Sequence, residues 1–158
     1  MAEMNLTAGN IGVLTLANAD ADANVLNAAA LTVPFIQDLT LDTTAGTQTY
    51  NVLDNSAGKT FTTTNTNSIT LNMLVDEETF FGDGSNAERV ANVGLLGSSI
   101  NKDKVYFELS FEGATAGARS VTGSGFISGL APVLNMDNAV IVSPMTIVID
   151  GQITSTTV

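Results

Sequence analysis

A strict alternation between Lys104 and Glu112 constrains the fold of this chain more than any other sequence feature. Every second residue is apolar: Val105, Phe107, Leu109 and Phe111. The residues between them are Tyr106, Glu108, Ser110 and Glu112. Successive side chains of a β-strand point to opposite faces, so this period predicts a strand with one buried and one solvated face. We expect the four apolar side chains in the core.

Other segments favour strands by the same reasoning: 35–43, 61–75, 120–130 and 139–154. In the first, one face comprises Phe35, Gln37, Leu39 and Leu41, and the opposite face comprises Asp38, Thr40 and Asp42. In the second, one face comprises Ile69, Leu71 and Met73, and the other comprises Ser68, Thr70 and Asn72. A short strand is also expected around Ile11, Val13 and Leu16.

Breaks between these segments follow from turn residues and charge. Thr44–Thr47 is expected to form a turn, and residues 50–58 a loop broken at Asp54, Asn55 and Ser56. The acidic run Asp76–Glu78 is expected to be a solvated connector that ends its strand. Pro144 interrupts the last strand, which predicts an edge position or a bulge there.

One helix is predicted after the acidic run. Ser85 and Glu88 have the spacing of a capping box, and Gly97 is expected to end the helix. The apolar stripe at helical spacing is Ala87, Val90, Ala91, Gly94 and Leu95. The expected fold is therefore mainly β, an antiparallel β-sandwich or partial barrel with one flanking α-helix. The 158 residues suit a single domain, with residues 1–31 as an N-terminal arm or loop-rich segment.

Composition argues against an enzyme. The chain has no Cys and no His, which excludes Cys and His nucleophiles and bases and the usual zinc sites. Its net charge of −11 makes specific binding to the phosphates of DNA or RNA unfavourable. No stretch approaches the length of apolar sequence that spans a membrane. We expect no cofactor, no metal and no membrane partner.

Three segments have some features of a ligand-binding or catalytic site, but a purely structural role explains each of them better. Residues 20–24 begin like a calcium loop, but Val25 and Leu31 occupy the positions where that loop needs Gly and an acid. Gly123, Gly125 and Gly129 lie in a strand pattern, where close backbone packing explains them better than phosphate binding does. Asp76–Glu78 could supply paired carboxylates for glycoside chemistry, but without an aromatic platform a solvated connector is the better interpretation.

The order of elements from Phe61 to Thr154 resembles that of the tail tube proteins of long-tailed bacteriophages. A Thr-rich strand at Ser68–Met73 precedes an acidic connector, a single helix and the strand from Lys104. The Gly-rich strand Gly123–Gly129 and the final run Met145–Thr154 follow. The first sixty residues depart from the family pattern. The related tube protein of bacterial type six secretion would share the fold.

The resemblance implies a structural virion protein of the tail, assembled in the host cytoplasm. Six copies would form a ring, and stacked rings would form a hollow tube that conducts DNA without binding it. Implied partners are further copies of the chain and the tape measure, tail terminator and baseplate proteins. The alternative is a cell-surface or secreted β-sandwich filament subunit of the pilus or S-layer type. A small acidic hydrolase is the weakest interpretation.

A tube wall needs apolar residues packed inside the subunit and short polar or acidic residues toward the channel. The polar faces of segments 35–43 and 61–75 meet this need, which predicts the following lumen-lining residues: Asp38, Thr40, Asp42, Thr70 and Asn72. Asp and Thr are equally common on an exposed outer surface. The alternative that these residues lie on the outside of the tube is therefore open at this point.

Overall fold

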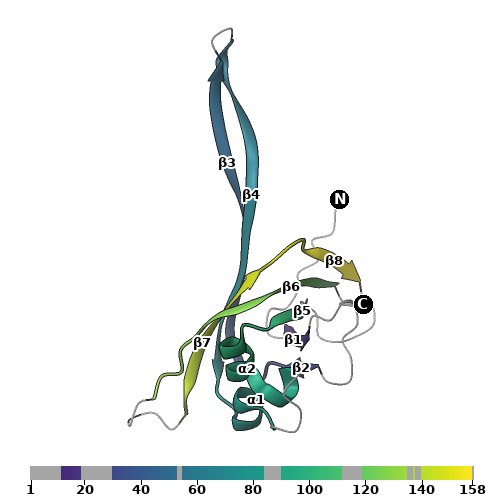
Figure 1. Ribbon diagram of the computed structural model, residues 1–158, viewed down its shortest axis with the longest axis vertical. Helices are drawn as coiled ribbons and strands as arrows, with labels where there is room; N and C mark the ends of the chain where they lie inside the picture. Colours follow the sequence, from purple (N-terminus) through teal and green to yellow (C-terminus); the bar gives the residue numbers. More distant parts are fainter. Residues whose placement is uncertain are drawn as a thin grey trace, which may run out of the picture.

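The structure, a computed structural model, describes residues 12–18, 30–52, 55–83, 90–111, 119–134, 137 and 140–157. Its strands are β1 (Val13–Asn18), β2 (Leu31–Thr32), β3 (Ile36–Val52), β4 (Asn55–Leu74), β5 (Lys104–Ser110), β6 (Arg119–Leu130), β7 (Val142–Ile149) and β8 (Thr154–Thr157). Its helices are α1 (Glu77–Phe81) and α2 (Val90–Asn101). Figure 1 shows a body from which β3 and β4 extend as a long hairpin.

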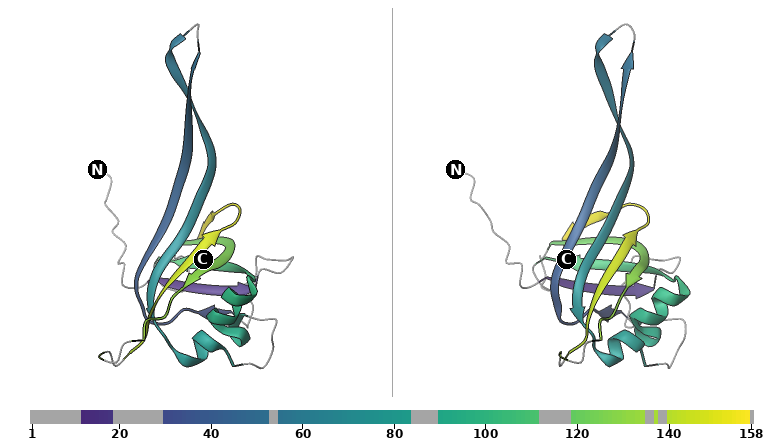
Figure 2. Two further views of the ribbon diagram at one scale, coloured as in Figure 1. Left: turned by 60° about the vertical axis from the view of Figure 1, so that its left-hand side comes forward. Right: turned by 90° about the vertical axis from the view of Figure 1, so that its left-hand side faces the viewer.

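The strands form one antiparallel sheet in the order β2-β1-β5-β6-β7-β4-β3, with β8 paired to β6. The sheet curls, and the two helices cover one end of the body (Figure 2). The predicted fold class, mainly β and antiparallel with a helix at its flank, is confirmed. The short helix α1 is an addition that the sequence did not predict.

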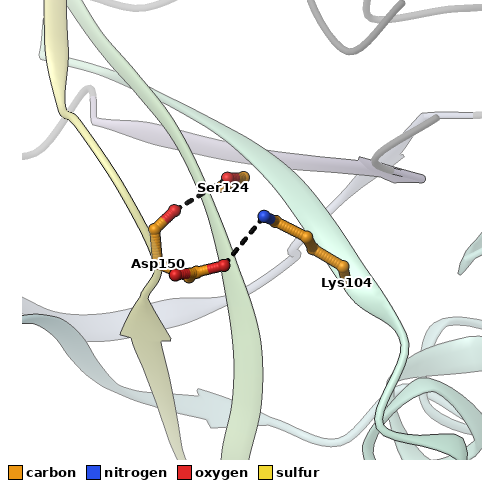
Figure 3. Close-up of polar contacts among 3 residues, drawn as sticks. All are labelled: Lys104, Ser124 and Asp150. Atoms are coloured by element: carbon orange, nitrogen blue, oxygen red, sulfur yellow. Dashed lines mark hydrogen bonds and ion pairs between the residues drawn. The ribbon is translucent and has the colours of Figure 1, made fainter. Parts of the chain in front are cut away.

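A corner between β7 and β8 bends the sheet. The pairs Gly125↔Ile149 and Thr122↔Thr154 leave residues 123–124 opposite residues 150–153. Asp150 holds this corner: its N–H donates to the Ser124 carbonyl at 2.8 Å, and its carbonyl accepts from the Ser124 hydroxyl at 3.0 Å. Its carboxylate pairs with Lys104 of β5 at 2.8 Å (Figure 3). The continuous strand predicted for 139–154 is therefore wrong, because these residues divide between β7 and β8.

The core takes its buried side chains from the strands of the sheet and from both helices. Val105, Phe107 and Leu109 are buried as predicted, and so are Ile69, Leu71 and Met73. Other strands contribute Leu14, Leu16, Ile127, Met145, Ile147 and Ile149, and the helices contribute Phe80 and Leu95.

Two predictions at the end of β5 are wrong. Phe111 is 38% exposed because β5 ends at Ser110, so the alternation no longer places its ring inside. Ser110 is buried rather than solvated. It lies between Val13 of β1 and Ser120 of β6, and Ser120 is itself fully buried.

The acidic run begins a helix rather than only ending a strand. The Asp76 carboxylate accepts from the Thr79 N–H at 3.1 Å and from the Thr79 hydroxyl at 3.0 Å, which caps α1. Glu77 and Glu78 are exposed, as predicted, and carboxylates in a first helical turn favour the helix.

The predicted end of the helix at Gly97 is wrong, since α2 continues to Asn101. The helix is interrupted instead at Gly94, whose φ is 68°. A Cβ at Gly94 would stand 2.5 Å from the backbone N of Gly82, so this glycine permits α1 and α2 to pack closely. Ser85 and Glu88, the proposed capping box, lie outside the described residues.

The turn predicted at Thr44–Thr47 and the loop predicted at 50–58 are also wrong. Residues 44–52 belong to β3, and β4 begins at Asn55. Gly46 marks a register shift between Ala45 and Thr47, which is a bulge within the ladder rather than a chain reversal.

Pro144 lies inside β7, where its carbonyl accepts from Ala131 N–H just past the end of β6. The predicted edge position is wrong, because β7 lies between β6 and β4. The ladder still loses little, because the missing N–H faces the side on which the pairing with β6 has already ended at Leu130↔Met145. Near the N-terminus, Val13 and Leu16 lie in β1 as expected, and Ile11 is outside the described residues. Among the described helices, none is long and apolar enough to cross a membrane.

Candidate channel surface and assembly hairpin

The five predicted lumen residues lie together on one face of two neighbouring strands. Asp38 is paired with Asn72, and Thr40 with Thr70, while Asp42 is opposite Ser68. Asn72 Nδ2 donates to both carboxylate oxygens of Asp38, at 2.9 and 3.1 Å. These bonds hold the carboxylate against the strand surface. The structure thus brings the five residues together, and their position in a channel stays a prediction.

The same face continues across β7. Thr70 is opposite Thr146, and Ser68 is opposite Val148. The reverse face of these strands carries the buried residues Ile69, Leu71 and Ile147. The result is a wall with an apolar side toward the core and an opposite side of short residues. That opposite side is polar on β3 and β4, where the described charges within the body are Asp38 and Asp42, and on β7 it includes the apolar residues Pro144 and Val148.

A second feature is the hairpin extension, residues 44–52 and 55–66. The last pair between β4 and β7 is Asn67↔Ile149. Beyond it, β3 and β4 pair only with each other, out to Val52↔Asn55. Apart from Gly46, the side chains described in the extension are exposed: Thr44, Ala45, Thr47, Gln48, Thr49, Tyr50, Lys59, Thr60, Phe61, Thr62, Thr63 and Thr66.

The extension also carries two large exposed rings. Tyr50 and Phe61 are 55% and 54% exposed, and their ring centroids are 6.0 Å apart. A two-stranded hairpin with no packed face is marginally stable in water. Within the subunit, the described contacts that stabilise the extension are its own ladder and this pair of rings.

Sequence reasoning missed most of the extension: only residues 61–66 fell within a predicted strand, that of 61–75. Its strands carry threonine and other polar residues on both faces, so they lack the apolar period that identified the strands of the body. The available signal was β-propensity alone: Thr is the most frequent residue in 40–49 and 60–66 and favours strands.

The remaining candidate sites have structural roles. A Cβ at Gly125 would stand 2.3 Å from the Val148 carbonyl oxygen, and one at Gly123 would stand 2.9 Å from Phe107 Cζ. The predicted close packing is confirmed at Gly123 and Gly125. It is wrong at Gly129, where the atom nearest to a Cβ would be 3.6 Å away. The calcium-like segment 20–24 lies outside the described residues. No group of three or more acidic side chains suited to a metal ion occurs in the part of the chain that the structure describes.

No protein-family model matches the sequence, and no curated protein matches it. Several solved structures do match the fold of this chain. A chain from the virion of a native gene transfer agent particle superimposes with a TM-score of 0.67 at 10% identity, over 96% of this chain and 99% of that one. A chain of the SPP1 tail tube matches with a TM-score of 0.61 at 9% identity, over 92% of this chain and 76% of that one.

A third match comes from the sheath-tube complex of an extracellular contractile injection system, PVC, in its extended state. Its TM-score is 0.57 at 16% identity, and it covers 93% of this chain and 88% of the other. At these identities the likeness concerns the fold, and it extends over almost the whole sequence. A coverage of 96% extends into the first sixty residues, which departed from the family pattern in sequence. The chain has the phage tail tube fold.

Proposed function

We propose that this protein is a structural virion protein that assembles into six-membered rings, which stack as a phage tail tube. The observation that carries the proposal is the hairpin extension, whose described faces have no cover within the subunit. Extended hydrophobic and hydrogen-bonding surface of this kind is a liability for a monomer and natural for a subunit of an assembly. One structural neighbour is the tail of an empty gene transfer agent particle with C6 symmetry, which supports the six-membered ring.

The polar face of β3, β4 and β7 lines the lumen in this proposal. Its side chains are short, which keeps a channel wide. Carboxylates at Asp38 and Asp42 repel the phosphate backbone, so DNA passes without being held. The Asp38–Asn72 bonds keep one carboxylate folded against the wall. The chain therefore acts as a conduit for DNA ejection and not as an enzyme.

The same assignment implies partners and a location. A tube of finite length must be closed at both ends and needs a length gauge, so tail terminator, baseplate and tape measure proteins are expected to meet its rings. Structural neighbours come from a tube terminating cap and a baseplate of the anti-feeding prophage, which supports the first two. The chain would work as one tail-tube-like domain within the tail of the virion, after assembly in the host cytoplasm.

Electron microscopy of the purified protein tests the proposal. Hollow tubes or six-membered rings are expected as concentration and ionic strength rise, because salt screens repulsion between subunits of charge −11. Solid filaments would support the cell-surface alternative instead. A monomer in sedimentation at every concentration and salt would contradict both forms of assembly.

A further inference from the structure

An open apolar hollow lies at the end of the body away from the hairpin extension. It has a volume of about 420 Å³ and is lined by Phe35, Leu74, Val75, Asp76, Val140 and Ile141. These residues come just before β3, at the end of β4 and just before β7, the strand ends farthest from the extension. Phe35 and Val140 are 66% and 54% exposed, so an apolar surface is left in water.

The extension presents two chemically different faces near its tip. Residues directly opposite each other in an antiparallel ladder share a face. Gln48 is opposite Phe61, and Tyr50 is opposite Lys59, so both aromatic rings and the lysine lie on one face. The other face carries the pair Thr49 and Thr60, whose hydroxyl oxygens are 3.0 Å apart. The aromatic face is the one suited to burial in a partner, since aromatic anchors dominate protein interfaces.

We propose that the aromatic face of the extension, with Tyr50 and Phe61, docks into the hollow of a second copy of this chain. The match is both apolar and electrostatic. A cavity of about 150 Å³ lined by aliphatic groups holds a benzene ring, so the hollow has ample room for an aromatic side chain. Lys59, beside the rings, is a cation, and Asp76 at the hollow is a carboxylate followed by Glu77 and Glu78.

The opposed positions of the two surfaces exclude docking within one copy. The extension points away from the body (Figure 1), and the residues that line the hollow lie at the opposite ends of β3 and β4. A contact between unlike surfaces on two copies is heterologous, and repeating it generates an open stack where the rotation does not close into a ring. This inference rests on the proposed stacking of rings and identifies the two surfaces that would join one subunit to another along the tube.

Disulfide trapping tests the contact, because the chain contains no Cys. Protein carrying Phe61→Cys is mixed with tagged protein carrying Val140→Cys under assembly conditions and mild oxidation, and mixed dimers are counted on a non-reducing gel. The matched control replaces Phe61→Cys with Thr60→Cys, the adjacent exposed residue on the opposite face of the hairpin. Tyr50→Cys serves as a second probe of the aromatic face. We expect mixed dimers with Phe61→Cys or Tyr50→Cys to form at least tenfold faster than with Thr60→Cys.

Equal rates for the two faces, or absence of mixed dimers, would overturn the docking. The outcome is separable from that of the proposed function. Tubes in the microscope without a Phe61–Val140 cross-link would reject the docking and leave the tube. Rapid, face-specific cross-linking without tubes or rings would retain the docking and reject the tail tube.

Discussion

The strand β4 divides into two regions that differ in pairing and in burial. Between Asn67 and Leu74 it is paired on both edges, and its alternate residues Ile69, Leu71 and Met73 are almost completely buried. Between Asn55 and Thr66 it is paired on one edge, and its described side chains are exposed. The same strand is thus stabilised by its own core in the body and has no such support in the extension. The body carries the stability of the subunit, and in the proposed assembly the extension makes the contacts between subunits.

The largest effect is expected in the body. Phe107→Ala removes a fully buried ring and should lower the free energy of unfolding by about 3–5 kcal/mol, through lost burial and the cavity left behind. Urea denaturation of the unassembled protein measures this. A loss well under 1 kcal/mol would mean that this face of β5 is not the core face, and the distinction between the two regions would fail.

Close backbone packing in the body gives a smaller effect. In Gly125→Ala the new Cβ meets the Val148 carbonyl oxygen at 2.3 Å, so strands β6 and β7 must shift. We expect a loss of about 1–3 kcal/mol, typical of overpacking. The matched control is Gly129→Ala, where the nearest atom is 3.6 Å away. Similar denaturation midpoints for the two variants would contradict the packing.

In the extension, a substitution should impair assembly without lowering the stability of the monomer. Phe61→Ala removes a ring that is 54% exposed and should change the unfolding free energy of the monomer by no more than about 0.5 kcal/mol. Assembly should nevertheless require at least a tenfold higher protein concentration, measured by light scattering. Thr60→Ala, on the opposite face, is the control. A Phe61→Ala protein that assembles like the wild type would show that this ring is not part of an interface.

The polar face should show the smallest structural effect. The double variant Asp38→Lys and Asp42→Lys alters exposed side chains, so rings should still form and the unfolding free energy should change by no more than about 1 kcal/mol. A basic channel would hold DNA phosphates, so infectivity of the reconstituted phage should fall. Asp38→Asn with Asp42→Asn controls for loss of the carboxylates without charge reversal. Unchanged infectivity of the lysine variant would favour an outer-surface position for this face.

The strands predicted correctly from the sequence share one property. Apolar residues recur at every second position, and the face of the strand that they form is buried. Leu109 and Ile69 were assigned to the core because each belongs to such a series. The candidate channel residues Asp38 and Asn72 were assigned to one face by the same alternation. Residues 44–52 and 55–60 of the extension were not predicted as strands because their described side chains have no buried face. Helix α1 was not predicted because its capping residue Asp76 belongs to an acidic run typical of a loop.

The amino-acid sequence by itself determined the antiparallel β class, the core faces of β4 and β5 and the short polar residues opposite them, because local alternation dictates which side of a strand is buried. Only the tertiary structure decided where each strand stops and what lies beside it. Ser110 is buried by its neighbours Val13 and Ser120, and the chain turns a corner at Asp150 where Ser124 and Lys104 hold it. Those contacts join residues far apart in sequence, and no local pattern encodes them.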